Sequence, residues 1–508
     1  MKQNWSKGYV ADLTYSHGYY HELSPPFIRF FLLMNGWANA SQGGDYNYCE
    51  LGYGQGVSCN LHAAANPRGR FFGTDFNPDH ALYAQGLSRQ AGVQADWRAL
   101  GFEEMLDADL PSFDFVTLHG VWSWIDAAAR HAVVEFLRRR LKVGGVVFIS
   151  YNILPGWSAE RPLRDLMWMH TEQASASGSA TSTRIQEAIA FADRLRQGKA
   201  AFFERNAPAN QMLDDMMRDD VHVVAHEYFN RSWHLSYFSE VAQALDAAGL
   251  SFACSLHRSD LTGEVFHRTQ PFQLGQLPPL LRQTSNDFVL NRRFRRDVFV
   301  RGGTRLPERQ RQAMLEQVAL VLLRPAGTLS ATQQTPYGSV TLDAHIVERV
   351  AAALEAAPGP LRIGELIRQA DLHSVVRERV FETLAALVAQ SQLSPVFEDD
   401  AEARGQARAA AMNRAIAERA RDGDELRYLC SPVTGQALEA SRADRLLLRA
   451  WLAGARRTAE LCAGAGLPED GAVPAGLPSA DELRERAGSF VQNVVPLWRR
   501  LGILEEAA

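Results

Sequence analysis

A glycine-rich turn is the part of this sequence whose residue types and spacing best suit chemistry. The run Tyr46–Leu51 reads as a short buried strand, and Gly52, Gly54 and Gly56 follow it. Glycine lets a backbone take positive φ and approach a ligand with no Cβ in the way. The helix expected next points its free N–H groups and the positive end of its dipole into the turn. The turn therefore suits a nucleotide-like ligand, and Glu50 just before it would attract a cationic group and repel a pyrophosphate.

Two acids further along the chain strengthen this interpretation. Asp75 ends the next apolar run, about 20 residues on, which is the spacing of an acid that holds ribose hydroxyls. Asp96 ends a third apolar segment and can accept a hydrogen bond from an adenine amino group, and Phe76 or Trp97 can stack on the base. Two alternatives stay open. One is a dinucleotide site, which expects its third glycine two residues further along, and the other is a glycine turn whose neighbouring acids only cap helices.

Apolar strands that alternate with helices must position these residues. We expect a strand at 113–120, a helix at 127–142 and a strand at 146–152. This alternation indicates a doubly wound Rossmann-like α/β fold, with a parallel sheet covered by helices on both faces. Ligands bind beyond the carboxyl ends of such strands, where the turn, both acids, His119–Trp124 and Tyr151–Trp157 lie.

A helical region interrupts this sheet before its last strands. Residues 160–219 read as helices, broken by a small-residue loop at 174–182. Strands expected at 250–255 and 296–301 then complete the sheet, and the domain ends near Gly303. The chain therefore predicts a helical insertion within the cofactor domain.

The last third of the chain shows no nucleotide signature. Helices expected at 344–356, 362–370 and 374–391, with the apolar stretch that follows them, resemble a winged-helix unit. Winged helices can bind DNA, but Asp and Glu are interspersed with Arg here, which favours packing or protein contact over a nucleic-acid partner. The expected division is a cofactor domain at 1–159 and 236–303, a helical insertion at 160–235, a winged-helix-like middle domain at 304–399 and a helical C-terminal domain at 400–508.

Composition places the chain among ordinary globular proteins. Its 508 residues, 46% hydrophobic and 22% charged, suffice for about two to four domains. A net charge of −5 gives no bulk attraction to nucleic acid or anionic lipid. The five cysteines are scattered, odd in number and without a C-x-x-C pair, which argues against a disulfide framework or a metal site. With no signal peptide and no membrane-spanning stretch expected, we predict a cytoplasmic protein without a membrane partner.

Glu50–Gly56, together with Asp75 and Asp96, resembles the cofactor half of a class I S-adenosylmethionine-dependent methyltransferase. Further segments are similar to bacterial members of this class that carry a methyltransferase regulatory domain: Leu118–Trp124, Ile149–Trp157, Ala225–Asn230 and Arg295–Gly302. The resemblance implies S-adenosylmethionine as cofactor, bound by residues Glu50, Gly52, Gly54, Gly56, Asp75, Phe76, Asp96, Trp97 and His119. That group includes protein-lysine methyltransferases acting on bacterial outer-membrane proteins. Its extra domains shape a substrate cleft, and dimers occur in it, so a homodimer is an expectation here.

Methyl transfer from a sulfonium is an in-line displacement that needs an aligned and, for an amine, deprotonated acceptor. His119 and Tyr151, at the ends of neighbouring strands, are expected to face the methyl group. His119 would accept a proton, while Tyr151 and Asn152 would orient the acceptor through hydrogen bonds. Trp122 and Trp124 would form an aromatic wall for a cationic amine. Packing alone is the alternative for the two tryptophans, and a structural role is the alternative for His119.

Three residues outside the sheet are further candidates for the substrate cleft. The aromatic segment 9–23, which contains Tyr20, is either a lid over the bound ligand or a docked N-terminal segment. Glu227 and Tyr228, in the insertion, follow His226, and this group offers too few ligands for a metal. We therefore expect Glu227 and Tyr228 either to cap a helix or to contact the cofactor domain and reach the cleft.

The sequence thus predicts a methyltransferase, with a protein lysine side chain preferred as acceptor because the accessory portion exceeds what a small substrate requires. No Asp/Asn-Pro-Pro-Tyr/Phe motif follows the fourth strand, which weakens an amino-methylation of nucleic acid. Two alternatives stay open: the same chemistry on a small molecule, lipid or sugar, and a regulatory or scaffold protein that only senses S-adenosylmethionine.

Overall fold

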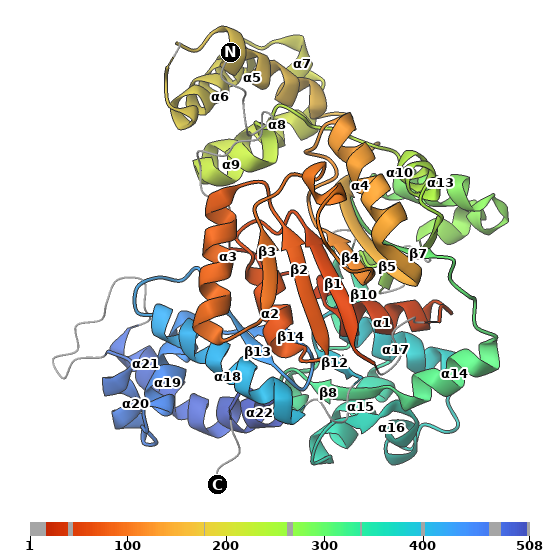
Figure 1. Cartoon of the computed structure of the whole chain (residues 1–508), viewed down its shortest axis with the longest axis vertical. Helices are drawn as coiled ribbons and strands as arrows, with labels where there is room; N and C mark the ends of the chain where they lie inside the picture. Colours follow the sequence, from red (N-terminus) through yellow and green to blue (C-terminus); the bar gives the residue numbers. More distant parts are fainter. Residues whose placement is uncertain are drawn as a thin grey trace.

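A seven-stranded sheet lies at the centre of the molecule (Figure 1). Its strand order is β3-β2-β1-β4-β5-β7-β6, with β7 antiparallel to both of its neighbours and the other pairs parallel. The strands are β1 (Tyr46–Leu51), β2 (Gly69–Thr74), β3 (Ala95–Arg98), β4 (Phe113–Leu118), β5 (Leu141–Asn152), β6 (Leu250–Ser255) and β7 (Phe294–Arg301). The computed structural model describes residues 17–38, 44–176, 178–261, 268–335, 338–397, 402–466 and 479–504. The predicted Rossmann-like α/β fold is confirmed, apart from the reversed strand β7.

Helices cover both faces of this sheet because alternate residues of each strand point to opposite sides. In β1, Tyr46 and Tyr48 join one core and Cys49 and Leu51 join the other. The first core packs on α1 (Pro25–Met34), α2 (Val57–Ala65) and α3 (Pro78–Ala91). The second packs on α4 (Ala127–Arg140) and α10 (Phe238–Asp246). The sheet is therefore doubly wound, as predicted.

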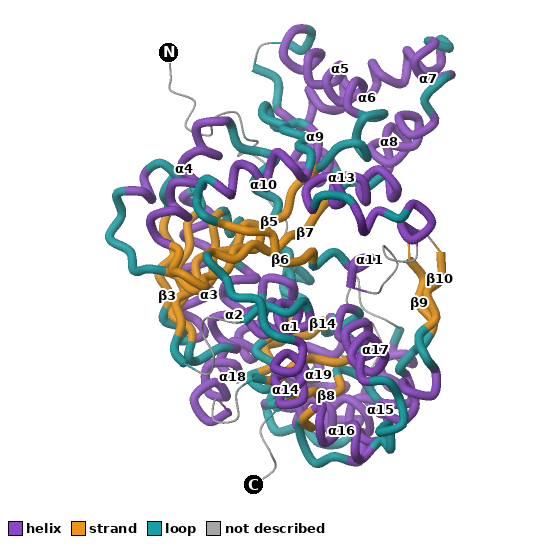
Figure 2. Tube along the Cα trace, turned by 90° about the vertical axis from the view of Figure 1, so that its right-hand side faces the viewer, coloured by secondary structure: helices purple, strands orange, loops and turns teal. Residues whose placement is uncertain are grey.

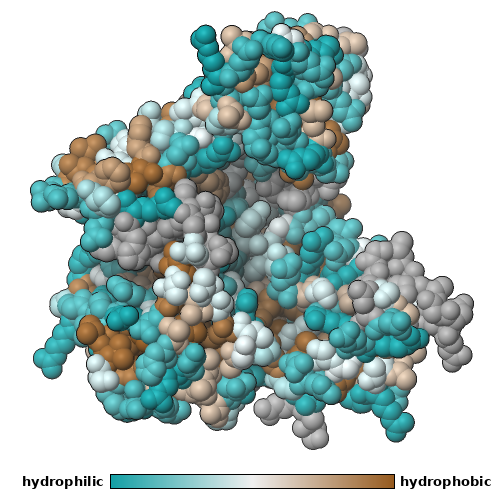
Figure 3. Space-filling view, turned by 180° about the vertical axis from the view of Figure 1, so that it is seen from behind, coloured by the Kyte–Doolittle hydropathy of each residue, from teal (hydrophilic) through white to brown (hydrophobic). Residues whose placement is uncertain are grey.

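A group of helices inserted after β5 stands beyond the carboxyl end of the sheet, at the top of Figure 1. Seen from behind, it projects from the body of the molecule (Figure 3). Its helices share a small core of their own, which includes Leu163, Met167 and Leu213. The helices are α5 (Arg161–Gln173), α6 (Thr181–Gln197), α7 (Ala201–Glu204), α8 (Ala207–Arg218) and α9 (Val221–Tyr228).

The neck of this insertion is tied to the end of the sheet by backbone hydrogen bonds. Leu154 N donates to Ser236 O at 3.1 Å, and His234 N donates to Ser123 O at 2.7 Å. Between the neck and β7 the chain forms α11 (Arg258–Leu261), the short turns η3 (Gln270–Phe272) and η4 (Leu274–Gln276), and α13 (Pro279–Leu290). Two further short turns flank the site, η1 (His21–Leu23) and η2 (Glu104–Leu106).

The middle part of the chain combines helices with a small antiparallel sheet, in the order β11-β8-β12, and with a separate hairpin of β9 and β10, at the right of Figure 2. The three helices predicted from the sequence are present as α15, α16 and α17, each within a few residues of its expected bounds. The elements are α14 (Glu308–Gln317), β8 (Ala319–Leu322), η5 (Ala326–Thr328), β9 (Thr332–Thr335), β10 (Gly338–Thr341), α15 (Ala344–Ala356), β11 (Leu361–Arg362), α16 (Ile363–Gln369), α17 (Arg377–Ala389) and β12 (Leu393–Val396).

The C-terminal part packs on α2 and α3, two helices that cover the cofactor half of the sheet. Helix α18 (Glu402–Arg419) lies against α2 and α3, and a single hydrophobic core joins these elements. The hairpin β13 (Tyr428–Ser431) and β14 (Gln436–Glu439) was not predicted from the sequence, which suggested helices alone. The remaining elements are α19 (Arg442–Leu452), α20 (Thr458–Gly464), α21 (Ala480–Ser489), η6 (Phe490–Val494) and α22 (Val495–Arg500). None of the helices in the described ranges is long and apolar enough to cross a membrane.

Candidate active site

A cavity opens beyond the carboxyl ends of β1, β2 and β4, where the topology of a doubly wound sheet places ligands. The turn after β1 forms its floor, and the segment before α1 and the loop after β4 contribute walls. The predicted site residues that line it are Tyr20, Glu50, Gly52, Gly54, Gly56, Asp75, Phe76, His119 and Trp124. It is also lined by Gly18, Tyr53, Gln55, Val57, Ser58, His80, Phe102, Gly120, Val121 and Ile125.

The turn needs its glycines for backbone conformation and for close packing. Gly52, Gly54 and Gly56 have φ of +76°, +57° and +71°. A Cβ on Gly52 would lie 2.5 Å from Val121, and one on Gly56 would lie 2.5 Å from Ala84. Gly56 caps the start of α2, so the turn leads directly into the free N–H groups of that helix.

Glu50 is a buried carboxyl group at the inner end of this turn. Its side chain is 3% exposed, and Oε2 makes no hydrogen bond within the described part of the chain. Burial, and then the charge of Asp75, raise the pKa of Glu50 to about 8. An unpaired buried carboxyl beside a cavity is costly to ionise without a cation, so this position is suited to a ligand ammonium.

Asp75 is oriented by three hydrogen bonds at the end of β2. Gly54 N donates to Oδ2 at 2.9 Å, and Asn77 N donates to Oδ1 at 3.0 Å. The ring of His80, in the first turn of α3, contacts the same Oδ1 through Nδ1 at 3.0 Å. Because an ionised carboxylate offers about four acceptor sites, Asp75 keeps capacity for ligand hydroxyl groups.

Two residues predicted to hold the base lie elsewhere. Asp96 forms an ion pair with Arg98 at 2.6 Å, and Trp97 is 3% exposed and donates from Nε1 to Ser88 Oγ at 2.7 Å. The direction of each side chain follows from the alternation of β3, which turns Trp97 into the core under α3. Phe102, in the loop after β3, lines the cavity, as does Phe76, the other ring that the sequence predicted for the base.

His119 forms the wall beside the turn, held between aromatic rings. Its ring centroid lies 3.8 Å from that of Tyr20 and 6.1 Å from that of Phe294. Nδ1 lies 3.1 Å from Ser150 Oγ, on the neighbouring strand. Burial lowers the pKa of His119 to about 4, with Glu22 opposing that shift. The imidazole is therefore neutral at pH 7.

The structure does not bring Tyr151, Asn152 and Trp122 to the cavity. Tyr151 is fully buried, and its hydroxyl donates to Asp297 at 2.6 Å. Trp122 is 3% exposed and packs in the core on the α4 side of the sheet. Asn152 is 8% exposed, with its backbone N bonded to Ser123 Oγ. Since Ser150 points toward His119, the pleat of β5 turns Tyr151 to the other face.

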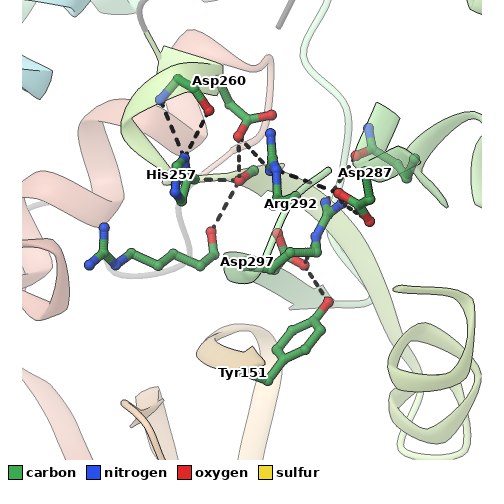
Figure 4. A network of polar contacts seen from close by, with 11 residues as sticks. Tyr151, His257, Asp260, Asp287, Arg292 and Asp297 are labelled. Carbon is green, nitrogen blue, oxygen red and sulfur yellow. Dashed lines mark hydrogen bonds and ion pairs between the residues drawn. The ribbon is translucent and has the colours of Figure 1, made fainter. Parts of the chain in front are cut away.

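Tyr151 instead joins a buried network of charged groups (Figure 4). Asp297 accepts its hydrogen bond and another from Arg295 Nε at 2.7 Å. Arg295 also donates to Asp287 at 2.8 Å, and Arg292 forms an ion pair with the same carboxyl at 3.5 Å. Burial raises the pKa of Asp287 to about 6 although both arginines oppose the shift. This network joins β7 to α13 beside the end of β5.

An aromatic cluster leads from the cavity toward the insertion. Trp124, on the cavity wall, stacks at 6.2 Å on Trp233, whose ring lies 5.4 Å from that of Trp157. Tyr228 on α9 contacts Trp157 edge to face at 6.3 Å. Glu227 lies exposed on the same helix and does not line the cavity. The described residues contain no group of three or more His, Cys, Asp or Glu that could hold a metal ion.

These residues fit an adenosyl sulfonium amino acid. The unpaired oxygen of Glu50 suits its ammonium group, the carboxylate of Asp75 suits ribose hydroxyls, and Phe76 and Phe102 offer rings to the base. Sequence reasoning missed His80, Phe102, Ser150 and Trp233. Two of them stand at motifs: His80 follows Asp75 within the first turn of the next helix, and Ser150 lies inside the segment Ile149–Trp157.

Comparisons with known proteins agree with this geometry. Residues 49–147 match the model of a methyltransferase domain, and residues 220–301 match that of a predicted methyltransferase regulatory domain. An uncharacterized protein of Synechocystis is 34% identical over 449 residues, which cover 88% of each chain. PKMT2 from Rickettsia typhi, solved in complex with AdoHcy, has a TM-score of 0.66 at 17% identity over 96% of this chain and 99% of its own. A second structure of PKMT2 from Rickettsia typhi has a TM-score of 0.64 at 18% identity, over the same shares of the two chains. The chain belongs to the S-adenosylmethionine-dependent methyltransferases that carry a predicted methyltransferase regulatory domain.

Proposed function

We propose that this enzyme methylates the side-chain amine of lysine residues in a protein, with S-adenosylmethionine bound by Glu50, the glycine turn and Asp75. One observation carries the acceptor class. The lining of the cavity includes the uncharged rings of Tyr20, His119 and Trp124. Such a lining suits a slim aliphatic chain that ends in an amine.

The charges around the cavity argue against an anionic acceptor. Among the described residues that line it, the carboxyl groups are Glu50 and Asp75, and neither Lys nor Arg is present. A carboxylate or phosphate acceptor would enter this space without a cationic side chain to pair with, which is costly in a buried site. An amine meets no such penalty once it has lost its proton.

His119 orients the acceptor and does not deprotonate it. Its pKa of about 4 lies some 6 units below the ordinary lysine value of about 10.4, a gap of roughly 8 kcal/mol for direct proton transfer. The amine therefore gives its proton to water before it enters, and the neutral imidazole holds it by a hydrogen bond. S-adenosylmethionine supplies an electrophilic methyl group when bound. The new N–C bond forms as the S–C bond breaks, and the product amine is released as its ammonium form.

The insertion supports a protein acceptor over a small molecule. The aromatic cluster of Trp124, Trp233, Trp157 and Tyr228 connects the cavity wall to α9, so the accessory helices stand where a large substrate would arrive. PKMT2, whose fold is similar over 96% of this chain, is a protein lysine methyltransferase.

The five cysteines are all free and buried, which supports a function in a reducing cytoplasm.

The test is transfer of labelled methyl groups from S-adenosylmethionine to proteins of a bacterial lysate. We expect labelled protein bands whose peptides carry methyllysine in fragmentation spectra. A parallel lysate with its lysine amines chemically blocked should give no labelled band, and Glu50→Gln enzyme should give little label. Label confined to the small-molecule fraction, or retained after the lysines are blocked, would overturn the lysine proposal.

A further inference from the structure

The segment before α1 carries two adjacent tyrosines that point to different parts of the protein. The backbone there is extended, with φ −126° and ψ 101° at Tyr20, so consecutive side chains turn to opposite sides. Tyr20 lines the cofactor cavity and packs on His119. Tyr19 points away from the cavity, toward the C-terminal hairpin of β13 and β14.

Tyr19 is fixed by that hairpin and by α2. Its hydroxyl accepts a hydrogen bond from Ala437 N, on β14, at 2.7 Å. Its ring lies 4.9 Å from that of Tyr428, on β13, and 5.2 Å from that of His62, on α2. The ring is 9% exposed, so this contact is buried at a point where residues 418 positions apart meet.

The hairpin is itself held by hydrogen bonds to α18 and to the end of α2. Asn413, on α18, exchanges two hydrogen bonds with the backbone of Cys430, at 2.6 and 2.9 Å. Asn66, at the end of α2, donates to Gly435 O at 2.7 Å. These hydrogen bonds therefore fix the position of the hairpin that carries the Ala437 amide.

Tyr20 is held in turn by α2, which begins at the glycine turn. Its backbone N donates to Ser58 Oγ at 3.0 Å, and that hydroxyl donates to Gly18 O at 3.3 Å. A Cβ on Gly18 would lie 2.8 Å from the Tyr20 hydroxyl, so the Tyr20 ring lies close to the backbone of Gly18. On the other side Glu22 forms an ion pair with Arg296, on β7, at 2.9 Å.

We propose that Tyr19 is a positioning residue of the cofactor site: anchored by the C-terminal hairpin, it holds the ring of Tyr20 over the cavity. This assigns the C-terminal part a role in cofactor binding and does not depend on the identity of the methyl acceptor. Tyr19 and Tyr20 are joined by a single peptide bond. A small shift of Tyr19 therefore also moves the ring of Tyr20 relative to His119.

Tyr19→Phe removes the anchoring hydroxyl and leaves the ring. A net hydrogen bond is worth about 1 kcal/mol, so we expect S-adenosylhomocysteine to bind roughly fivefold more weakly by calorimetry. Amide exchange at residues 20–22 should be faster. In kinetics, KM for S-adenosylmethionine should rise more than kcat falls. The matched control is Tyr428→Phe, which removes a neighbouring hydroxyl that makes no hydrogen bond to any described residue, and it should bind S-adenosylhomocysteine as the unaltered enzyme does.

The coupling between the two tyrosines decides whether Tyr19 acts through Tyr20. We expect Tyr20→Ala to weaken binding of S-adenosylhomocysteine, and Tyr19→Phe to add no further loss in the Tyr20→Ala background. Additive losses in the double variant, or unchanged affinity and exchange in Tyr19→Phe, would overturn the proposal. An equal loss of affinity in Tyr428→Phe would overturn the proposal as well. It would mean that any change in the hairpin weakens binding, whether or not the Tyr19 hydrogen bond is kept.

Discussion

Ser150 holds the ring of His119 from the neighbouring strand, with its Oγ 3.1 Å from Nδ1 of the histidine. The same oxygen accepts a hydrogen bond from Gly120 N at 2.7 Å. One hydroxyl therefore fixes both the imidazole and the backbone of the loop that carries it. His119 also lines the cavity, so its ring is placed to orient an acceptor amine.

Replacing this hydroxyl should impair turnover more than cofactor binding. In Ser150→Ala the ring of His119 loses its orienting contact and Gly120 N loses its acceptor. A loss of about 1.5 kcal/mol at the transition state corresponds to a roughly tenfold lower kcat. We expect the Kd of S-adenosylhomocysteine to stay within about threefold. Steady-state kinetics and calorimetry measure both quantities.

Ser123→Ala is the matched control for that experiment, because Ser123 is equally buried and its hydroxyl accepts from Asn152 N outside the cavity. Its kcat should remain close to that of the unaltered enzyme. An equal fall of kcat in both variants would mean that Ser150 acts on loop stability alone.

Cofactor binding should release a proton from Glu50. Its folded-state pKa of about 8 lies above the ordinary value of 4.5, so the ligand-free site is mostly protonated at pH 7. A ligand ammonium favours the carboxylate, so binding expels this proton, and affinity should rise by up to about tenfold per pH unit below pH 8. Calorimetry at pH 7 in buffers of different ionisation enthalpy should detect close to one released proton. Glu50→Gln should release none.

The same shift sets the sign of a stability effect. Between pH 4.5 and about 8, folded Glu50 binds a proton that the unfolded chain has lost. The contribution of Glu50 to the free energy of unfolding therefore falls as pH rises through this window. Urea unfolding of the ligand-free protein at pH 5.5 and 7.5 should show a smaller decline in Glu50→Gln than in the unaltered chain.

The cofactor site could be located from the sequence because its residues lie close together along the chain. Glu50, the turn and Asp75 lie within consecutive strand–turn–helix units, and such units fold as short-range patterns predict. Three other residues at the predicted strand ends do not line the cavity, because their side chains make contacts outside it: Asp96, Trp97 and Tyr151. The direction of a side chain depends on the pleat register, which a strand assignment without exact bounds does not determine.

Contacts between distant parts of the chain could not be predicted from sequence motifs. Tyr19 meets Ala437 across 418 residues, and Asn66 meets Gly435 across 369. No periodicity marks such a pair, because each residue by itself reads as ordinary packing. The buried charges around Asp297 are a similar case, since isolated Arg and Asp residues on β7 and α13 read as surface residues.

His80 should contribute to cofactor binding by holding Asp75. In His80→Ala, Asp75 loses the contact to its Oδ1 and turns more freely. We expect S-adenosylhomocysteine to bind roughly three- to tenfold more weakly, because Asp75 keeps the hydrogen bonds from Gly54 N and Asn77 N and loses only part of its orientation. His80→Asn, which keeps a donor, should recover part of the affinity. The exposed neighbour Asp79, changed to Ala, is the control and should have almost no effect.

Tyr151 should matter for stability and not for the cofactor site. Its hydroxyl donates to the buried carboxylate of Asp297, and burial raises the pKa of Tyr151 well above its usual value, so the phenol stays protonated. Tyr151→Phe removes a hydrogen bond to a charged acceptor, which should lower the free energy of unfolding by about 1.5–3 kcal/mol in urea denaturation. The Kd of S-adenosylhomocysteine should not change.

Tyr48→Phe provides the comparison, because the Tyr48 hydroxyl meets the neutral Thr117 at 2.8 Å in the same sheet. Its loss should cost about 1 kcal/mol, less than that of Tyr151, since neutral pairs are weaker than charge-assisted ones. A kcat loss in Tyr151→Phe at unchanged stability would instead return Tyr151 to the catalytic group that the sequence suggested. Arg295→Met should be far more destabilising than either, because it leaves Asp297 and Asp287 as buried carboxylates without their guanidinium.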